Sequence, residues 1–273
     1  YRTPHTRSPH THFLSNGRYT TGLTHAGGGS SSWRGLSVTR RREDRTSDAG
    51  AHYIYLRDPW SGDVWSPTFQ PTCREADEYE AVFELDKVTF RRRDGDFETQ
   101  LQVVVSPEDD VEVRRLSITN RGDRPREVEV TSYAEVVLAR SEDDLAHPAF
   151  AKLFIETEYD AQSAGLLFSR RPRSAEETHA WAFHVLAVDG RLGGAVEWET
   201  DRARFLGRGR SLANPVALDG RVHYAFTARL RTLFDELAGR LQNETLLVDL
   251  RLLEAIDSTG MGLLARLGRA SLR

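Results

Sequence analysis

The chain has 273 residues and a formal net charge of −4. It is long enough to bury a full core as one large domain or two smaller ones, and it carries no overall basic charge that would attract nucleic acid or an anionic membrane. A single cysteine, Cys73, excludes an internal disulfide framework and a cysteine-based metal site, and it fits a reducing compartment. No apolar run of about 18 residues and no signal peptide are found, so we expect no membrane span and a cytoplasmic location. We also expect no metal or cofactor.

The chain begins with Tyr1 and not with methionine, which indicates a fragment of a longer product. Residues 1–12 are polar and contain prolines and histidines, which predicts an extended leader. His10 and His12 could contact a metal from one side of an extended strand, but no acidic or cysteine partner lies nearby in the sequence, so a solvated tail is favoured. Residues 13–72 mix short apolar runs with turn-forming pairs such as Asn-Gly and Gly-Asp, which predicts strands joined by tight turns.

The clearest β pattern follows. Residues 97–105 alternate between apolar and polar or small side chains at period two, as a strand with one buried face requires. Val111 and Val113 alternate in the same way, whereas Leu116 and Ile118 fall one residue out of phase, which predicts a bulge between the two pairs. Further strand-like segments follow at residues 128–136, 180–188 and 195–198. The first two-thirds of the chain is therefore predicted to be mainly β, as a large sandwich of antiparallel sheets.

The pattern changes near residues 218–220. Residues 226–241 carry apolar side chains at helical spacing and predict an amphipathic helix. Residues 245–250 are apolar with little alternation, as in a strand covered on both faces, and a second helix is expected to begin near Thr259. This order predicts a short α/β segment that is not part of the sandwich. We therefore divide the chain into an extended leader (1–12), a β-sandwich (13–220) and an α/β segment (221–273).

A set of uncommon short motifs occurs in a fixed order in the front part of the chain. The motifs lie at residues 14–19, 33–36, 39–44, 53–58, 62–67, 70–71, 105–110 and 202–210. In this order they resemble the β-supersandwich domain of cyclic β-1,2-glucan synthases, a family that shares its phosphorylase module with cellobiose and chitobiose phosphorylases and was once grouped as glycosyltransferase family thirty-six. The resemblance covers roughly residues 4–220. It implies a large antiparallel β-supersandwich of galactose-mutarotase-like fold.

The resemblance also implies a role in carbohydrate chemistry. Members of that family transfer or phosphorolyse β-glucosidic bonds, and their general-acid aspartate sits in an (α/α)6 barrel that follows the sandwich. The full-length relatives are associated with the inner membrane. This sequence contains no helical barrel, so the resemblance implies a non-catalytic carbohydrate-binding or scaffold fragment. Its expected partners are a β-glucan or oligosaccharide and the missing barrel.

The front part contains two acidic clusters that could serve glycosidic chemistry. Paired carboxylates for that chemistry are separated by about 5 to 10 Å. Asp109 and Asp110 are adjacent in sequence, as are Glu142, Asp143 and Asp144, and both clusters lie in turn-like segments. They suit solvated loops better than an opposed pair, so no catalytic residue is predicted.

Aromatic rings and arginines of the family motifs are candidates for carbohydrate binding. Rings could stack on sugar faces, and guanidinium groups could donate hydrogen bonds to hydroxyls. The candidates are Trp33, Arg34, Arg40, Tyr55, Arg57 and Trp65. The alternative is a place in the core or at a domain interface, which is favoured because large aromatic residues dominate burial in sandwiches.

The tail carries a second resemblance. The apolar strand at residues 245–250 and the motif at residues 256–264 are similar to the middle of a STAS domain, the fold of anti-sigma-factor antagonists. The resemblance implies phosphorylation of Thr259, or of the neighbouring Ser258, by a sigma-factor regulatory kinase. A phosphate at that place would meet the positive end of the following helix. A simple helix N-cap at residues 257–260 is the alternative.

Overall fold

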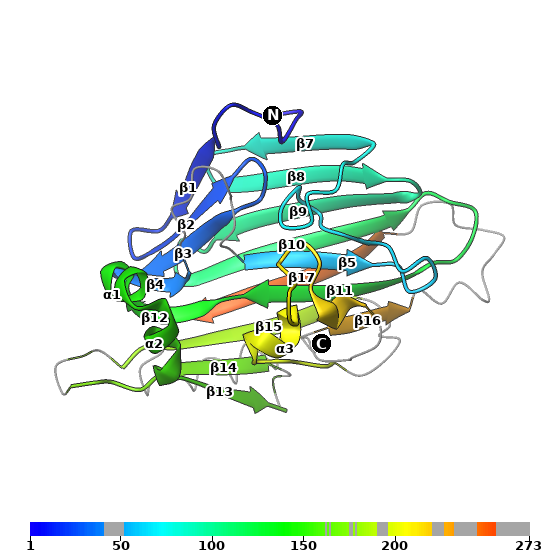
Figure 1. Cartoon of the computed structure of the whole chain (residues 1–273). Coiled ribbons are helices and arrows are strands. Elements are labelled where there is room, and N and C mark those ends of the chain that lie inside the picture. The colour runs from blue at the N-terminus through cyan, green and yellow to red at the C-terminus, as the bar shows by residue number, and fades with distance from the viewer. Residues whose placement is uncertain are drawn as a thin grey trace.

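The computed structural model describes residues 1–40, 52–161, 163, 165–174, 177, 179–189 and 196–219, and the backbone of the strands at 227–231 and 245–254. In this part of the chain the strands form three antiparallel sheets, as Figure 1 shows. The predicted mainly β fold with several antiparallel sheets is confirmed. No helix in the described ranges has the length and apolar character needed to cross a membrane.

The largest sheet has eight strands in the order β13-β14-β15-β17-β10-β9-β8-β7. In Figure 1 these strands are stacked from β7 at the top to β13 at the bottom. Their bounds are β7 (Glu78–Phe83), β8 (Lys87–Asp94), β9 (Phe97–Val105), β10 (Val111–Asn120), β13 (Ile155–Asp160), β14 (Gly165–Arg170), β15 (Trp181–Asp189) and β17 (Thr245–Glu254). The period-two pattern of residues 97–105 is thus confirmed as strand β9.

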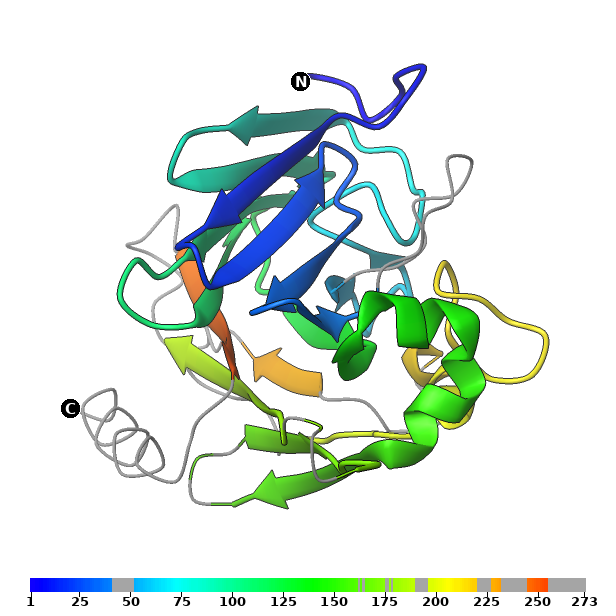
Figure 2. The same ribbon diagram turned by 90° about the vertical axis from the view of Figure 1, so that its left-hand side faces the viewer.

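Two smaller sheets lie against the large one (Figures 1 and 2). One has the order β1-β2-β3-β4-β12 and the other the order β16-β11-β5-β6. The strands of the first are β1 (Thr11–Ser15), β2 (Tyr19–Thr24), β3 (Gly29–Trp33), β4 (Leu36–Thr39) and β12 (Val136–Arg140), and those of the second are β5 (His52–Arg57), β6 (Val64–Trp65), β11 (Glu127–Ala134) and β16 (Thr227–Arg231). Short helices join them: α1 (Ser141–Ala146), α2 (Pro148–Ala151), η1 (Lys152–Phe154), α3 (Arg202–Leu206) and η2 (Val216–Leu218).

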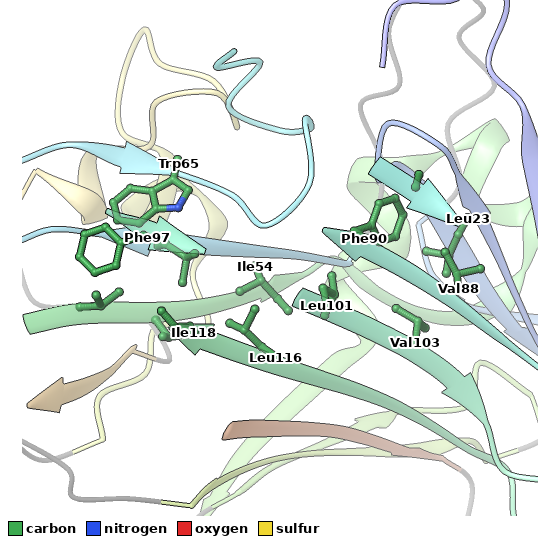
Figure 3. Close-up of a cluster of buried hydrophobic side chains, with 14 of the residues drawn as sticks. Leu23, Ile54, Trp65, Val88, Phe90, Phe97, Leu101, Val103, Leu116 and Ile118 are labelled. Atoms are coloured by element: carbon green, nitrogen blue, oxygen red, sulfur yellow. The ribbon is translucent and has the colours of Figure 1, made fainter. Parts of the chain in front are cut away.

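The main core lies between the four-stranded and the eight-stranded sheets. Ile54 on β5 packs with Leu101 on β9 and Leu116 on β10, and all three are at most 2% exposed. Figure 3 shows these side chains gathered between the two sheets. Because neighbouring residues of a strand point to opposite faces, Tyr53 and Tyr55 lie on the outer face of β5. There they pack in a second cluster with residues of α3 and η2. Strand β5 is therefore buried on both sides.

Strand β10 differs from the sequence expectation. It pairs with β9 without a shift of register, so the bulge predicted between Val113 and Leu116 is wrong. The inward face of β10 is instead continuous from Glu112 through Arg114 to Leu116, and all three residues are buried. Val111 and Val113 point to the other face. The prediction failed because it assumed that inward positions are apolar, whereas this face buries an ion pair, with Arg114 Nε 2.6 Å from Glu112 Oε1.

The segment after residues 218–220 also differs in part. Residues Thr227–Arg231 form β16, which pairs with β11, so the helix predicted over 226–241 is wrong for these five residues. Their polar and apolar side chains alternate, which fits a strand as well as a helix. The predicted strand at 245–250 is confirmed within β17, but β17 lies between β10 and β15 in the large sheet and not in a separate α/β layer. Ser258 and Thr259 lie outside the described residues.

The leader is held against the sandwich and is not a free tail. The amino group of Tyr1 donates a hydrogen bond to the Ala81 carbonyl of β7 (2.7 Å). The Tyr1 ring stacks on His10 with 4.9 Å between ring centroids. His12 belongs to β1, and its Nε2 lies 2.8 Å from the carbonyl oxygen of Glu84. His10 is exposed, as expected for a solvated segment, but the segment is held on the edge of the large sheet and is not a free tail.

Candidate functional site

The structure places the two aromatic candidates of the four-stranded sheet in the interior. Tyr55 has no exposed surface, and its hydroxyl donates to the carbonyl of Leu212 (2.8 Å). Burial, followed by the nearby Tyr133, raises the pKa of Tyr55 well above its ordinary value. Trp65 is 2% exposed and packs against Phe97 in the main core. Neither ring presents an open face, which fits the structural alternative.

Two of the arginine candidates form ion pairs with carboxylates of the protein itself. Arg40 is buried and donates from Nε and Nη2 to the carboxylate of Asp144 (2.9 and 2.7 Å). Its Nη1 donates to Glu135 Oε2 (3.1 Å). Arg57 donates from Nη1 to Glu129 Oε2 (2.7 Å). The bidentate pair of Arg40 fixes the α1 helix to the end of β4.

The remaining candidates lie at the turn between β3 and β4. Trp33 is half-buried and donates from Nε1 to Asp110 Oδ2 (2.6 Å), and Arg18 donates from Nε to the other oxygen of Asp110 (2.7 Å). The guanidinium of Arg34 lies 5.0 Å from the centre of the Trp33 ring and is exposed. The six predicted residues are thus distributed over two sheets and are not brought together in one site.

A cavity of about 720 Å³ lies elsewhere, against the face of β13, β14 and β15. The junction of β11 and β12 and the segment leading into α3 form its other walls. Its size is within the range of small-molecule sites, about 300 to 1,000 Å³. Charged and aromatic side chains both line it, among them Tyr133, Glu135, Lys152, Phe168, His184 and Arg202.

Glu135 is the centre of the polar wall of this cavity. Its Oε1 accepts hydrogen bonds from the hydroxyl of Tyr133 (2.8 Å) and from Arg202 Nε (2.6 Å). Its Oε2 accepts from Arg40 Nη1 and lies 3.6 Å from Lys152 Nζ. Charge-assisted bonds of this kind are short and directional, so they hold these side chains in one arrangement before any ligand arrives.

The same contacts determine the ionisation of the wall. Burial alone would raise the pKa of Glu135, but the hydrogen bond and charge of Arg202, followed by the charge of Lys152 and the hydrogen bond of Tyr133, lower that pKa to about 2. The pKa of Lys152 is lowered by burial, with Arg40 and Arg202 adding to the effect and Glu135 opposing it. The carboxylate of Glu135 is therefore ionised at neutral pH and has no proton to donate.

Sequence reasoning missed Glu135, Lys152 and Arg202. Two signals were available, because Lys152 is one of two lysines in the chain and Arg202 begins the family motif at residues 202–210. Glu135 gave no signal, since the three cations that contact it, Arg40, Lys152 and Arg202, lie in other elements of the chain. No three His, Cys, Asp or Glu side chains of the described residues come together in a way that could hold a metal ion.

The family of the chain follows from comparison with known proteins. Residues 1–233 match the glycosyl hydrolase 94 supersandwich domain. The chain belongs to this family. The curated cyclic β-(1,2)-glucan synthase NdvB of Rhizobium meliloti (strain 1021) is 38% identical over 206 residues, which are 76% of this chain and 7% of that protein. The predicted resemblance to glucan synthases and chitobiose phosphorylases is confirmed.

Two phosphorylases are further relatives. The N,N'-diacetylchitobiose phosphorylase of Vibrio furnissii is 27% identical over 220 residues, covering 79% of this chain and 26% of that enzyme. The solabiose phosphorylase of Paenibacillus borealis is 26% identical over 207 residues, covering 74% and 26%. The chain spans at most about a quarter of the length of these three relatives. The family match extends beyond residue 220 and includes β16.

Proposed function

We propose that this glycosyl hydrolase 94 supersandwich is a non-catalytic carbohydrate-binding and scaffold part of a larger enzyme, and that the cavity beside β13–β15 is its binding site. The observation that carries the proposal is membership of the family over residues 1–233. The relatives are named for β-(1,2)-glucan, diacetylchitobiose and solabiose, so a saccharide is the ligand class that fits best. The scaffold role is toward the (α/α)6 barrel of longer members, in a cytoplasmic enzyme.

The composition of the cavity supports a saccharide ligand. Sugars offer hydroxyls that both donate and accept hydrogen bonds, and their ring faces pack on aromatic groups. Glu135, Lys152 and Arg202 supply charged groups held by one another, and Tyr133 and Phe168 supply rings beside them. A wall that is fixed in advance lowers the ordering cost of binding.

The absence of catalysis is supported by the state of Glu135. A glycosidase general acid carries a raised pKa so that it holds a proton at neutral pH. Glu135 has the opposite shift, with a pKa of about 2, and both of its oxygens accept from arginines. We expect no formation of sugar 1-phosphate when the chain is incubated with phosphate and cellobiose or β-1,2-glucan.

Isothermal titration with β-1,2-gluco-oligosaccharides and cello-oligosaccharides tests the binding. Thr157→Trp adds an indole on the cavity face of the edge strand β13, whereas Glu158→Trp places the same side chain on the opposite face of that strand. The proposal expects heat of binding in the parent and in Glu158→Trp, and its loss in Thr157→Trp. No heat at millimolar saccharide would leave only the scaffold role.

A STAS-type regulatory role is the alternative function from the sequence. The candidate phosphoacceptors Ser258 and Thr259 lie outside the described residues, and nothing in the described residues favours this role over the first.

The surface pair Trp33 and Arg34 remains a second predicted place for a saccharide, because Arg34 is exposed.

A further inference from the structure

A stacked pair of aromatic rings lies next to the cavity. Tyr159 of β13 and Trp198 stack with 3.6 Å between ring centroids and an interplanar angle of 12°. Trp198 directly precedes Glu199, which lines the cavity. One face of the indole is covered by Tyr159, yet Trp198 is still 40% exposed. An indole with this much free surface, held flat by a partner ring, is available to a ligand.

The strand register places Tyr159 on the cavity side of the sheet. Tyr159 is paired with Leu166 on β14, and Leu166 is paired with His184 on β15. Directly paired residues of adjacent strands share one face, and Leu166 and His184 both line the cavity. Thr157, two residues before Tyr159, lines it as well. The ring pair therefore continues the floor of the cavity along β13.

The charges around the cavity select the kind of ligand. The charged residues of the lining are the cations Lys152 and Arg202 and the carboxylates Glu135, Glu199 and Asp201. Arg40 and Arg204 lie beside Glu135 and Asp201, so positive and negative charges nearly balance and no excess of cations is available for a phosphate. The outer face of β13 adds further exposed carboxylates at its alternate positions. A neutral polyhydroxylated ligand suits these surroundings better than an anion.

We propose that Trp198, backed by Tyr159, is a stacking subsite for a pyranose ring of a neutral oligosaccharide. The other rings of that oligosaccharide occupy the cavity, so this inference rests on the proposed function. The carbon-bound hydrogens of a pyranose face are weakly positive and pack on the negative face of an indole. The subsite extends the site beyond the cavity, so it adds affinity for saccharides too long to fit inside it. Binding should increase with chain length until the subsite is filled.

Titration of the parent chain with neutral β-1,2-gluco-oligosaccharides of increasing length tests the subsite. Trp198→Ala should weaken binding of the longer saccharides by about tenfold and leave the disaccharide unchanged, since one aromatic contact is lost. Trp198→Phe retains a ring and should restore most of the difference. Trp60→Ala is the matched control, because Trp60 is 83% exposed in the turn between β5 and β6.

Three results would overturn the inference. If Trp198→Ala binds every length as tightly as the parent while Thr157→Trp loses binding, the cavity is a saccharide site but the ring pair is not a subsite. If glucose 1-phosphate binds more tightly than neutral saccharides, the ligand class is wrong. If the parent binds no saccharide of any length, the subsite and the cavity site fail together.

Discussion

Replacing Glu112 by alanine removes the acceptor at the centre of a buried polar cluster. Glu112 has no exposed surface, and its Oε2 accepts from the hydroxyls of Tyr19 (2.7 Å) and Ser31 (2.6 Å). Its Oε1 accepts from Arg114 Nε, and Arg114 Nη1 donates to the carbonyl of His52 (2.7 Å). The cluster joins the five-stranded sheet to β10 of the large sheet, so its loss acts on the packing of both.

The expected loss in the free energy of unfolding follows from the charge of Arg114, which Glu112→Ala leaves without its partner. Burial alone would raise the pKa of Glu112, but Arg114 first, and then Ser31 and Tyr19, lower it, so Glu112 is charged in the folded protein. Removing one partner of a buried ion pair costs about 3 to 5 kcal/mol, because the remaining charge is left uncompensated. For a chain of this size, about 2 to 4 °C of melting temperature is lost per kcal/mol. We therefore expect Glu112→Ala to melt about 6 to 20 °C below the parent.

Urea denaturation and calorimetry measure the effect. Glu158→Ala on the exposed face of β13 is the control, since surface substitutions stay within about 0.5 kcal/mol of the parent. The double variant Glu112→Met, Arg114→Met removes both charges and should regain part of the stability, because the bonds of Glu112 with Tyr19 and Ser31 are still lost. If Glu112→Ala lies within about 1 kcal/mol of the parent, or if the double variant is less stable than Glu112→Ala, the buried pair does not stabilise the fold as argued.

Three further predictions concern the core, the cavity wall and the last strands. Leu116→Ala should lower the free energy of unfolding, measured by urea denaturation, by about 2 to 5 kcal/mol. Leu85→Ala, at a 99% exposed position, should change it by less than about 0.5 kcal/mol. Equal effects of the two substitutions would contradict the assigned core. The pKa of Glu135 is about 2 in the folded protein and 4.5 ordinarily, so the unfolded chain binds more protons between these values. The contribution of Glu135 to the free energy of unfolding is therefore present above about pH 4.5 and is lost as the pH falls toward 2. Glu135→Gln should reduce the acid sensitivity of the melting temperature in a pH series. An unchanged slope of melting temperature against pH would refute this assignment. Ending the chain after Asp219 removes β16 from the edge of the four-stranded sheet and β17 from between β10 and β15, and it should abolish cooperative unfolding by circular dichroism. A cooperative transition of undiminished stability would show that both strands are dispensable.

Local patterns of the sequence predict the strands whose inward residues are apolar. The alternation of residues 97–105 identified β9 because one of its faces is buried and the other is partly exposed. The same rule failed on β10, where Glu112 and Arg114 occupy inward positions and form an ion pair along one face of the strand. A different prediction failed at Thr227–Arg231, where helical spacing was followed although these five residues also alternate as in a strand. Pairing with β11 decides for the strand. Pairing and burial of charge are tertiary properties that no short window contains.

The candidate site was harder to predict than the fold. Family motifs identified Arg40 and Tyr55, but both are used within the scaffold, in an ion pair with Asp144 and in the cluster with α3. Glu135 becomes prominent only when β4, η1 and α3 bring Arg40, Lys152 and Arg202 to it from distant parts of the chain. A resemblance can therefore give the class of ligand, while the place of binding depends on contacts of long sequence separation.

Hydrogen exchange with and without an oligosaccharide tests the central claim most directly, because it reports where the chain binds as well as whether it binds. With a saturating β-1,2-gluco-oligosaccharide, we expect slower exchange in β13, β14 and β15 and in the segment from Trp198 to Phe205, and no change in the turn that holds Trp60. Protection confined to the β3–β4 turn around Trp33 and Arg34, or no protection at all, would contradict a saccharide site in this cavity.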